Sequence, residues 1–249
     1  MDPRRSSTEP SWAGPDAPLP PPGNLLLVDL PDEVLSVLAE HVERISYPLR
    51  EVLFEEGDPI ETVYFPLTGM TSLVTTLEDG TSLEAMTVGH EGFVGVPLIN
   101  GVATHRSKGI CQIEGDFLQM PSEPFMEIFD GSKHLTVKLR RYSQFAHEVV
   151  TQSAACNGMH RIEQRCARWL LTTADAVGRT KFTLTQEFLS QMLGVRRAGV
   201  TVAIGALERR SLISHRYGHV EILDLEGLKK AACECHGTVS KKALELLVD

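Results

Sequence analysis

The chain has 249 residues, of which 42% are hydrophobic and 23% are charged, a balance typical of globular proteins rather than disordered ones. No run approaches the roughly 18 consecutive apolar residues of a membrane-spanning helix, and no apolar secretory signal opens the sequence, so we expect a cytoplasmic protein with no membrane partner. Its five cysteines are an odd number at irregular spacing, which argues against a disulfide framework and for reduced thiols.

The net charge of −9 is distributed unevenly along the chain. Residues 24–130 carry 19 acidic side chains and only four basic ones, whereas residues 160–230 carry 12 basic and seven acidic ones. A negative whole-chain charge would by itself argue against nucleic-acid binding, because Lys and Arg neutralise the phosphates. The asymmetry instead predicts an acidic regulatory module joined to a basic nucleic-acid module.

The first 23 residues are predicted to form a disordered arm, because prolines recur through them and residues 20–22 are three prolines in a row. A helix is predicted from about Leu30 to Arg44. It begins with the helix-start signal Pro31-Asp32-Glu33, and apolar residues follow at helical spacing.

Residues 24–131 are predicted to form an all-β jelly roll, because glycines recur between short β-rich runs. The predicted strands are residues 50–54, 62–66, 71–77, 82–88, 105–113 and 116–120. The clearest hairpin spans residues 77–81, where Asp79-Gly80 predicts a two-residue turn with positive φ angles.

Residues 132–158 are predicted to form one long helix with an apolar stripe at alternating steps of four and three. This stripe consists of Leu135, Leu139, Tyr142, Ala146 and Val149. Two interpretations stay open: a seam between two copies in a homodimer, or the face of a helix that packs on its own β domain.

Residues 159–230 predict a winged helix-turn-helix, so the whole chain reads as an α+β protein with a helical tail at 231–249. A helix at about 161–177 ends at Gly178, and two short helices are separated by Gly194, with Thr185 as the N-cap of the first. Two strands around Gly218 then form the wing.

The second short helix, about residues 196–210, is predicted to enter the major groove, where Arg side chains bond guanine and helix N-termini hold phosphates. The predicted DNA-binding residues are Thr185, Gln186, Arg196, Arg197, Gly199, Thr201, Arg209 and Arg216.

The segment Phe54–Gly69, with Gly57-Asp58 between two predicted strands, resembles the opening of the cyclic-nucleotide-binding jelly roll. Together with the long helix and the winged helix-turn-helix in this order, the chain resembles the Crp/Fnr family of bacterial transcription regulators. The resemblance implies a non-enzymatic homodimer that binds double-stranded DNA, with RNA polymerase as a further partner. The alternative is a jelly roll that binds a small molecule or a protein and carries a helical domain that does not bind DNA.

The expected effector pocket departs from the family pattern. In nucleotide-binding members the pocket contains a Phe-(Ile/Val)-Gly-Glu-Leu stretch followed by Arg-Ser/Thr-Ala. The Glu of the first stretch holds the ribose, and the Arg of the second holds the cyclic phosphate. Here the candidate pocket residues are Phe93, Gly95, Val96, His105, Arg106 and Ser107. Val96 replaces the Glu and His105 falls at the position of the Arg, with Arg106 one residue away, which on a strand is the opposite face. We therefore expect that cyclic AMP and cyclic GMP are not its ligands.

The cysteines predict no cofactor and no metal. Residues 1–110 contain no Cys, which excludes the N-terminal iron-sulfur cluster of oxygen-sensing members. The run Cys233-Glu234-Cys235-His236 resembles half of a ligand set, but no second pair follows at zinc spacing. Small buried thiols in a turn of a C-terminal helix are therefore expected.

Overall fold

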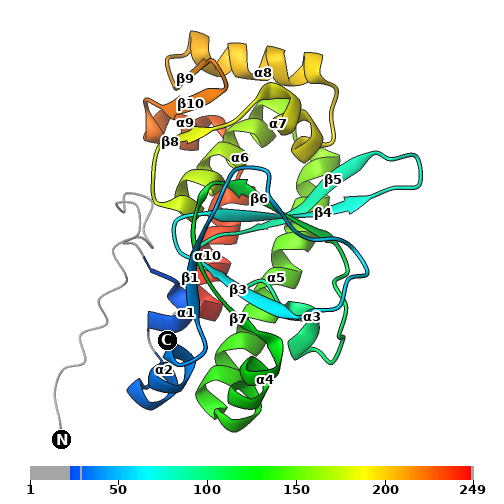
Figure 1. The fold of residues 1–249 in the computed structure, drawn as a ribbon. Coiled ribbons are helices and arrows are strands. Elements are labelled where there is room, and N and C mark those ends of the chain that lie inside the picture. The colour runs from blue at the N-terminus through cyan, green and yellow to red at the C-terminus, as the bar shows by residue number, and fades with distance from the viewer. Residues whose placement is uncertain (1–22, 29, 248–249) are drawn as a thin grey trace, which may run out of the picture.

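The computed structural model describes residues 23–28 and 30–247 and has a β-rich domain alongside one long helix and a helical domain beyond the C-terminal end of that helix (Figure 1). The α+β fold predicted from the sequence is confirmed. The predicted disordered arm lies outside the described residues except for Gly23. In the part of the chain that the structure describes, no helix is long and apolar enough to cross a membrane.

The β-rich domain contains two antiparallel sheets, one in the order β1-β7-β3 and the other in the order β2-β6-β4-β5. The strands are β1 (Glu43–Tyr47), β2 (Val52–Phe54), β3 (Thr62–Pro66), β4 (Met70–Thr76), β5 (Ser82–Val88), β6 (Lys108–Ile113) and β7 (Gly115–Pro121). The short helices of this domain are α1 (Leu25–Val28), α2 (Asp32–Ala39), α3 (Val96–Ile99) and α4 (Ser122–Gly131). Aromatic side chains fill its core, with the Phe93 ring 5.3 Å from both Phe65 and Phe125.

The helix predicted as far as Arg44 is too long. It ends at Ala39, and Arg44 lies instead in β1, where Ile45 pairs with Phe117 of β7. The helical spacing of the apolar residues continues past the true end, so only the pairing with a strand distant in sequence decides the conformation. The strand predicted at residues 105–113 is also shorter than expected, because β6 begins at Lys108.

The hairpin between β4 and β5 is real, but its turn has three residues rather than two. The backbone N–H of Leu77 donates to the carbonyl of Thr81, and that of Gly80 donates to the carbonyl of Leu77. Of the turn residues, only Gly80 has positive φ, at +82°. Asp79 contributes differently, since its carboxylate accepts the Thr81 N–H at 2.9 Å. This is a type I turn followed by a left-handed glycine.

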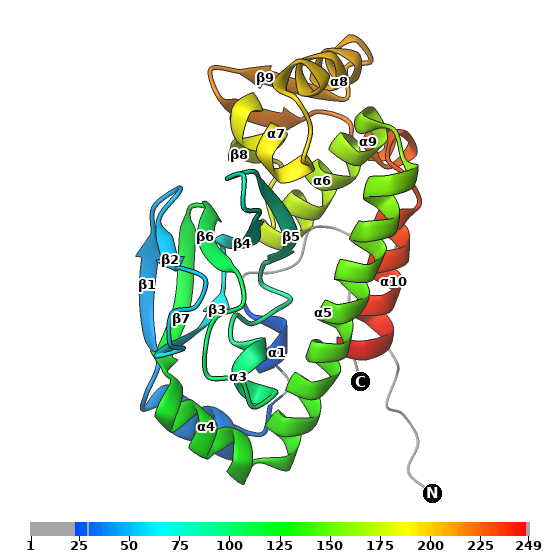
Figure 2. The same cartoon turned by 90° about the vertical axis from the view of Figure 1, so that its right-hand side faces the viewer.

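The long helix α5 (Lys133–Met159) turns its predicted apolar stripe toward its own β domain (Figure 2). Leu135, Leu139, Tyr142 and Ala146 are buried in the same core as the phenylalanines of the β domain, and Val149 packs against it. The interpretation as a dimer seam is therefore wrong for Leu135, Leu139, Tyr142 and Ala146, and for the half-buried Val149 it stays a prediction. The stripe is apolar because the helix covers the open side of the β domain of the same chain.

The helical domain follows the sequence prediction closely. Its elements are α6 (Ile162–Val177), β8 (Lys181–Thr183), α7 (Gln186–Leu193), α8 (Arg197–Arg209), β9 (Ile213–Arg216), β10 (His219–Ile222) and α9 (Leu225–Ala231). Two of these elements were absent from the prediction: β8, which completes a sheet of order β8-β10-β9, and α9. The last helix, α10 (Cys235–Leu247), runs back along α5 (Figure 2). It is therefore part of the packed structure rather than an isolated tail.

Candidate nucleic-acid interface

The helix-turn-helix formed by α7 and α8 is fixed at both ends of α7. The Thr185 side chain caps the helix by accepting the Phe188 N–H at 3.2 Å, as predicted. At the other end Gly194 is left-handed, with φ +60°, and the Val195 N–H returns to the carbonyl of Ser190 at 3.0 Å. The glycine relieves the strain of that conformation, so the turn sets the angle at which α8 leaves α7.

Helix α8 has a buried face and an exposed, basic start. Its apolar side chains Val200, Ala203, Ile204 and Leu207 are buried in the core of the helical domain, as the spacing predicted. Arg196 and Arg197, the N-cap and the first residue of the helix, are exposed. Helix α8 lies at the edge of the molecule farthest from the β domain, so this start is open to solvent (Figures 1 and 2).

The arginines predicted to contact DNA are not engaged elsewhere. Among the residues that the structure describes, no ion pair or hydrogen bond involves the guanidinium groups of Arg196, Arg197, Arg209 or Arg216. Arg210 differs, since its guanidinium is paired with the Glu163 carboxylate of α6 at 3.2 Å. The free arginines therefore lie at the start of α8, at its end and on the wing.

The polar residues Gln186 and Thr201 bind each other. The Thr201 hydroxyl of α8 donates to the Gln186 Oε1 of α7 at 2.7 Å. Both side chains lie on the outer side of the helix-turn-helix, and their bond braces the two helices at the point where DNA would approach. The Gln186 amide nitrogen is left available as a donor.

Gly199, one of the predicted DNA contacts, lies on the side of α8 that faces α6. A Cβ atom at this position would meet the Cδ1 of Ile162 in α6 at 3.1 Å, so the missing side chain faces the interior. The glycine lets α8 approach α6 closely and has a packing role.

The wing formed by β9 and β10 presents Arg216 at its tip. The turn consists of Tyr217 and Gly218, both with positive φ, at +52° and +78°. Tyr217 is 99% exposed and has no role in a core of the described chain. An aromatic ring and a cation at a wing tip suit contact with a nucleic-acid backbone.

Comparisons with known proteins agree with this geometry. Residues 44–132 match the cyclic nucleotide-binding domain, and residues 164–231 match the Crp-like helix-turn-helix domain. Both domains occur in this order in one protein family. The chain belongs to the Crp/Fnr family of transcription regulators. A helical domain that does not bind DNA, the alternative weighed above, is set aside by the second match.

Two curated relatives and one solved structure illustrate this Crp/Fnr membership. The chain is 26% identical to the transcriptional regulator SdrP of Thermus thermophilus, over 76% of this chain and 94% of that protein. It is 28% identical to the transcriptional regulatory protein btr of Bordetella pertussis, over 82% of this chain and 87% of that protein. The structure of FixK2 from Bradyrhizobium japonicum has the same fold, with a TM-score of 0.65 at 17% identity over 77% of this chain and 98% of that one.

Among the candidate effector residues of this Crp/Fnr regulator, His105 is buried and Arg106 is exposed. The His105 ring is buried and stacks on Phe54, with the ring centroids 3.5 Å apart. Burial lowers the pKa of His105 to about 4, so this imidazole is neutral at physiological pH. Arg106 is exposed, and Ser107 and Val96 are half-buried.

Two of the candidate pocket residues belong to the core. The Phe93 ring packs in the aromatic cluster, 6.2 Å from the Tyr142 ring, and is 1% exposed. A Cβ at Gly95 would meet the Phe93 ring at 2.6 Å, and its φ is +157°. These residues shape the loop before α3 and do not present groups to a phosphate.

No basic side chain of the β domain is placed to neutralise a buried phosphate. Its four basic residues are Arg44, Arg50, Arg106 and Lys108. Arg44 is paired with Asp116, and Lys108 is paired with Glu55 at 2.7 Å. Arg50 donates to Thr185 of the helical domain, and Arg106 is exposed.

The two domains contact each other through a half-buried carboxyl group that the sequence did not indicate. Glu84 of β5 accepts the Trp169 indole N–H of α6 at 2.9 Å and the Ser72 hydroxyl at 2.6 Å. Desolvation raises the pKa of Glu84 to about 7, and the two hydrogen bonds oppose this rise.

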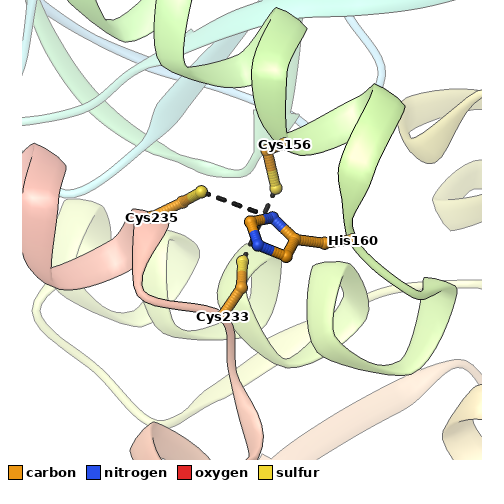
Figure 3. A group of neighbouring side chains, drawn as sticks. All are labelled: Cys156, His160, Cys233 and Cys235. Atoms are coloured by element: carbon orange, nitrogen blue, oxygen red, sulfur yellow. Dashed lines mark hydrogen bonds between the residues drawn. The ribbon is translucent and has the colours of Figure 1, made fainter.

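The structure also brings together a cluster that sequence reasoning missed. Cys233 and Cys235 lie against Cys156 and His160 at the end of α5 (Figure 3). The second ligand pair that the sequence was thought to lack is therefore present. Its signal was the Cys156-x-x-x-His160 spacing, which puts both side chains on one face of a helix. These four residues could hold a metal ion.

Proposed function

We propose that this Crp/Fnr regulator is a homodimer that binds a two-fold symmetric DNA site through the helix α8 of each subunit. The observation that carries the proposal is the start of α8, where Arg196 and Arg197 are exposed and unpaired while the opposite face of the helix is locked in the core. An α-helix fits the major groove, and an Arg at its start reaches the base edges first. Two such helices in a dimer read half-sites one DNA turn apart, about 34 Å.

The roles of the arginines follow from their positions. Arg197 lies where family members contact a guanine, and we assign it the bidentate bond to that base. Arg209 and Arg216 lie at the far end of α8 and on the wing, and we assign them phosphate contacts. Ala198 and Val202 stand where the best-known member reads further bases, so the operator of this protein differs from that of the cyclic AMP receptor protein.

The experiment is selection of binding sites from random DNA, followed by fluorescence anisotropy on the selected duplex and on its single-base variants. Arg197→Ala should lose about 1–3 kcal/mol of discrimination at one base pair in each half-site. Arg216→Ala should weaken binding to all sequences similarly and reduce the salt dependence. Arg106→Ala, an exposed Arg on the β domain, is the matched control and should change neither. Failure to enrich any sequence would refute sequence-specific binding.

The dimer interface is assigned to the face of α5 that points away from the β domain and from α10. This face carries the exposed apolar Val137 and the small or polar residues Gln144, Thr151, Ala155 and Gly158. A Cβ at Gly158 would meet no atom within 4 Å, so a second helix can approach closely there. Ala155→Arg should yield monomers in light-scattering chromatography, while Ala39→Arg in α2 should not. Unchanged mass for Ala155→Arg would place the interface elsewhere.

We propose that the β domain responds to a signal other than cyclic AMP or cyclic GMP. The support is that each of the four basic side chains of the described β domain is exposed or already paired, since burying an unpaired phosphate charge costs several kcal/mol. Isothermal titration of the full-length protein with each nucleotide should show no binding at submillimolar concentrations. Stoichiometric binding of either one would overturn this part of the proposal and leave the assignment of α8 untouched.

A further inference from the structure

The cluster of Cys156, His160, Cys233 and Cys235 joins segments that are far apart in the sequence. Cys156 and His160 lie in the last turn and at the C-cap of α5, and the other two lie at the junction of α9 and α10. One ligand atom from each residue can be chosen so that all four lie within 4.8 Å of one another. The three sulfur atoms and the imidazole point toward a common centre (Figure 3).

We propose that these four residues form a structural Zn²⁺ site with three thiolates and one imidazole. Tetrahedral zinc has Zn–S bonds of about 2.3 Å and Zn–N bonds of about 2.0–2.1 Å, so neighbouring ligand atoms are about 3.5–3.8 Å apart. The Sγ atoms of Cys156 and Cys233 are 3.5 Å apart, and the His160 Nδ1 is 3.6 Å from the Cys235 Sγ. These two distances therefore already match the spacing that the ion requires, and all four ligand atoms lie within 4.8 Å of one another.

The surroundings orient the ligands as in other zinc sites. The second ring nitrogen of His160, Nε2, lies 3.2 Å from a carboxylate oxygen of Glu234. A carboxylate on the far side of a ligating imidazole fixes its tautomer and raises its basicity. Gln152 donates its amide N–H to the Cys235 Sγ at 3.1 Å, a bond that favours the thiolate.

The burial of the three cysteines and the charges around them also suit a structural zinc site. All three cysteines are at least 96% buried, since Cys156 and Cys235 are 0% and Cys233 is 4% exposed. Three thiolates and Zn²⁺ carry one net negative charge, and the guanidinium groups of Arg165 and Arg168 interact electrostatically with Cys156. Four protein ligands leave no position open for water, so the site is structural rather than catalytic.

The position of the site gives it a consequence for DNA binding. His160 is one of the two residues between α5 and α6, where the long helix passes into the helical domain. Cys233 precedes α10 and Cys235 is its first residue, and this helix packs back on α5. An ion held by both segments would fix the angle between α5 and the helix-turn-helix, and its loss would free that angle.

The test is Co²⁺ titration of the full-length protein, purified with a reductant and stripped of metal. We expect uptake of about one Co²⁺ per chain with the intense visible bands of a tetrahedral thiolate site, and displacement by Zn²⁺. Zn²⁺ should also raise the melting temperature. Cys235→Ser and His160→Gln should abolish the tetrahedral spectrum, whereas Cys111→Ala and Cys166→Ala, which remove buried thiols outside the cluster, should retain it.

A variant that keeps all four ligands distinguishes weaker metal binding from misfolding. Glu234→Gln should fold normally and bind Zn²⁺ about 10–100-fold more weakly, because only the partner of the imidazole is changed. Absence of Co²⁺ uptake by the reduced wild-type protein would overturn the proposal. So would an octahedral spectrum, or a spectrum that Cys235→Ser leaves unchanged.

Discussion

Replacing Glu84 with Gln isolates a carboxyl group that is half-buried between the two domains. Its oxygens accept hydrogen bonds from Trp169 of α6 and Ser72 of β4. Glutamine has nearly the same shape, its carbonyl oxygen can accept the indole N–H, and it carries no charge at any pH. The substitution therefore removes the ionisation and leaves the packing.

The sign and size of the effect follow from the pKa. The pKa of Glu84 rises from its ordinary value of 4.5 to about 7, because ionisation in this position is opposed by desolvation. Below 4.5 the carboxyl is protonated in both the folded and the unfolded chain. Between 4.5 and 7 only the folded chain keeps the proton, so its free energy of unfolding decreases as the pH rises. At 1.36 kcal/mol per pH unit the limit is about 3.4 kcal/mol, and for a half-buried group we expect about 1–3 kcal/mol.

Urea unfolding of wild type and Glu84→Gln at about pH 5 and about pH 8 measures this difference. The variant should gain about 1–3 kcal/mol over the wild type between the lower and the higher pH. Trp169 fluorescence is a direct probe, since its indole bonds the altered side chain. Glu78→Gln, at an exposed site in the adjacent hairpin, is the control and should show no such gain. Equal stability differences at the two pH values would refute the reasoning.

Three further predictions test the packing of the helices. Leu139→Ala should lower the free energy of unfolding by about 2–5 kcal/mol in urea titrations, because the side chain is fully buried; a loss below about 1 kcal/mol would contradict the inward orientation of the α5 stripe. Gly199→Val should lower the stability by about 1–3 kcal/mol by forcing α8 away from Ile162, whereas Gly205→Ala, with its nearest neighbour 3.5 Å away, should raise the melting temperature slightly. Thr185→Ala should cost about 1 kcal/mol through loss of the α7 cap, and an unchanged melting temperature would show that the cap is dispensable.

The structure of the helical domain could be predicted from local sequence signals. The prediction was less accurate for the β domain, because its strands depend on pairing between distant segments. Gly194, Thr185 and the apolar spacing of α8 act within a few residues, so the helix-turn-helix could be predicted from the sequence. Strand β1 could not, because its residues continue a helical pattern and adopt the extended conformation only by pairing with β7. The same limit explains why the stripe on α5 was ambiguous. Apolar spacing shows that a face is covered, but not whether the cover is the same chain or a second copy.

The same distinction between local and distant signals decides which candidate sites could be predicted from the sequence. The exposure of Arg196 and Arg197 follows from their place before an amphipathic helix, which the sequence shows. The Cys and His cluster was hidden because its two halves are over 70 residues apart and meet only when α10 folds back on α5. Each half alone has a spacing that is common in proteins without a metal.

The contacts between the domains define where a signal in the β domain would first be felt. Arg50, held in a left-handed conformation with φ +71°, donates to Thr185 at 3.2 Å and lies 5.9 Å from the centre of the Phe188 ring. Thr185 is also the N-cap of α7 and a predicted DNA contact, so one hydroxyl joins the β domain to the first helix of the helix-turn-helix. Glu84 makes a second link, to α6. A movement of either strand segment relative to α6 and α7 must break one of these bonds, and the angle of α8 depends on both helices. A signal in the β domain can therefore reach the DNA-binding helices through these direct contacts as well as through the long helix α5.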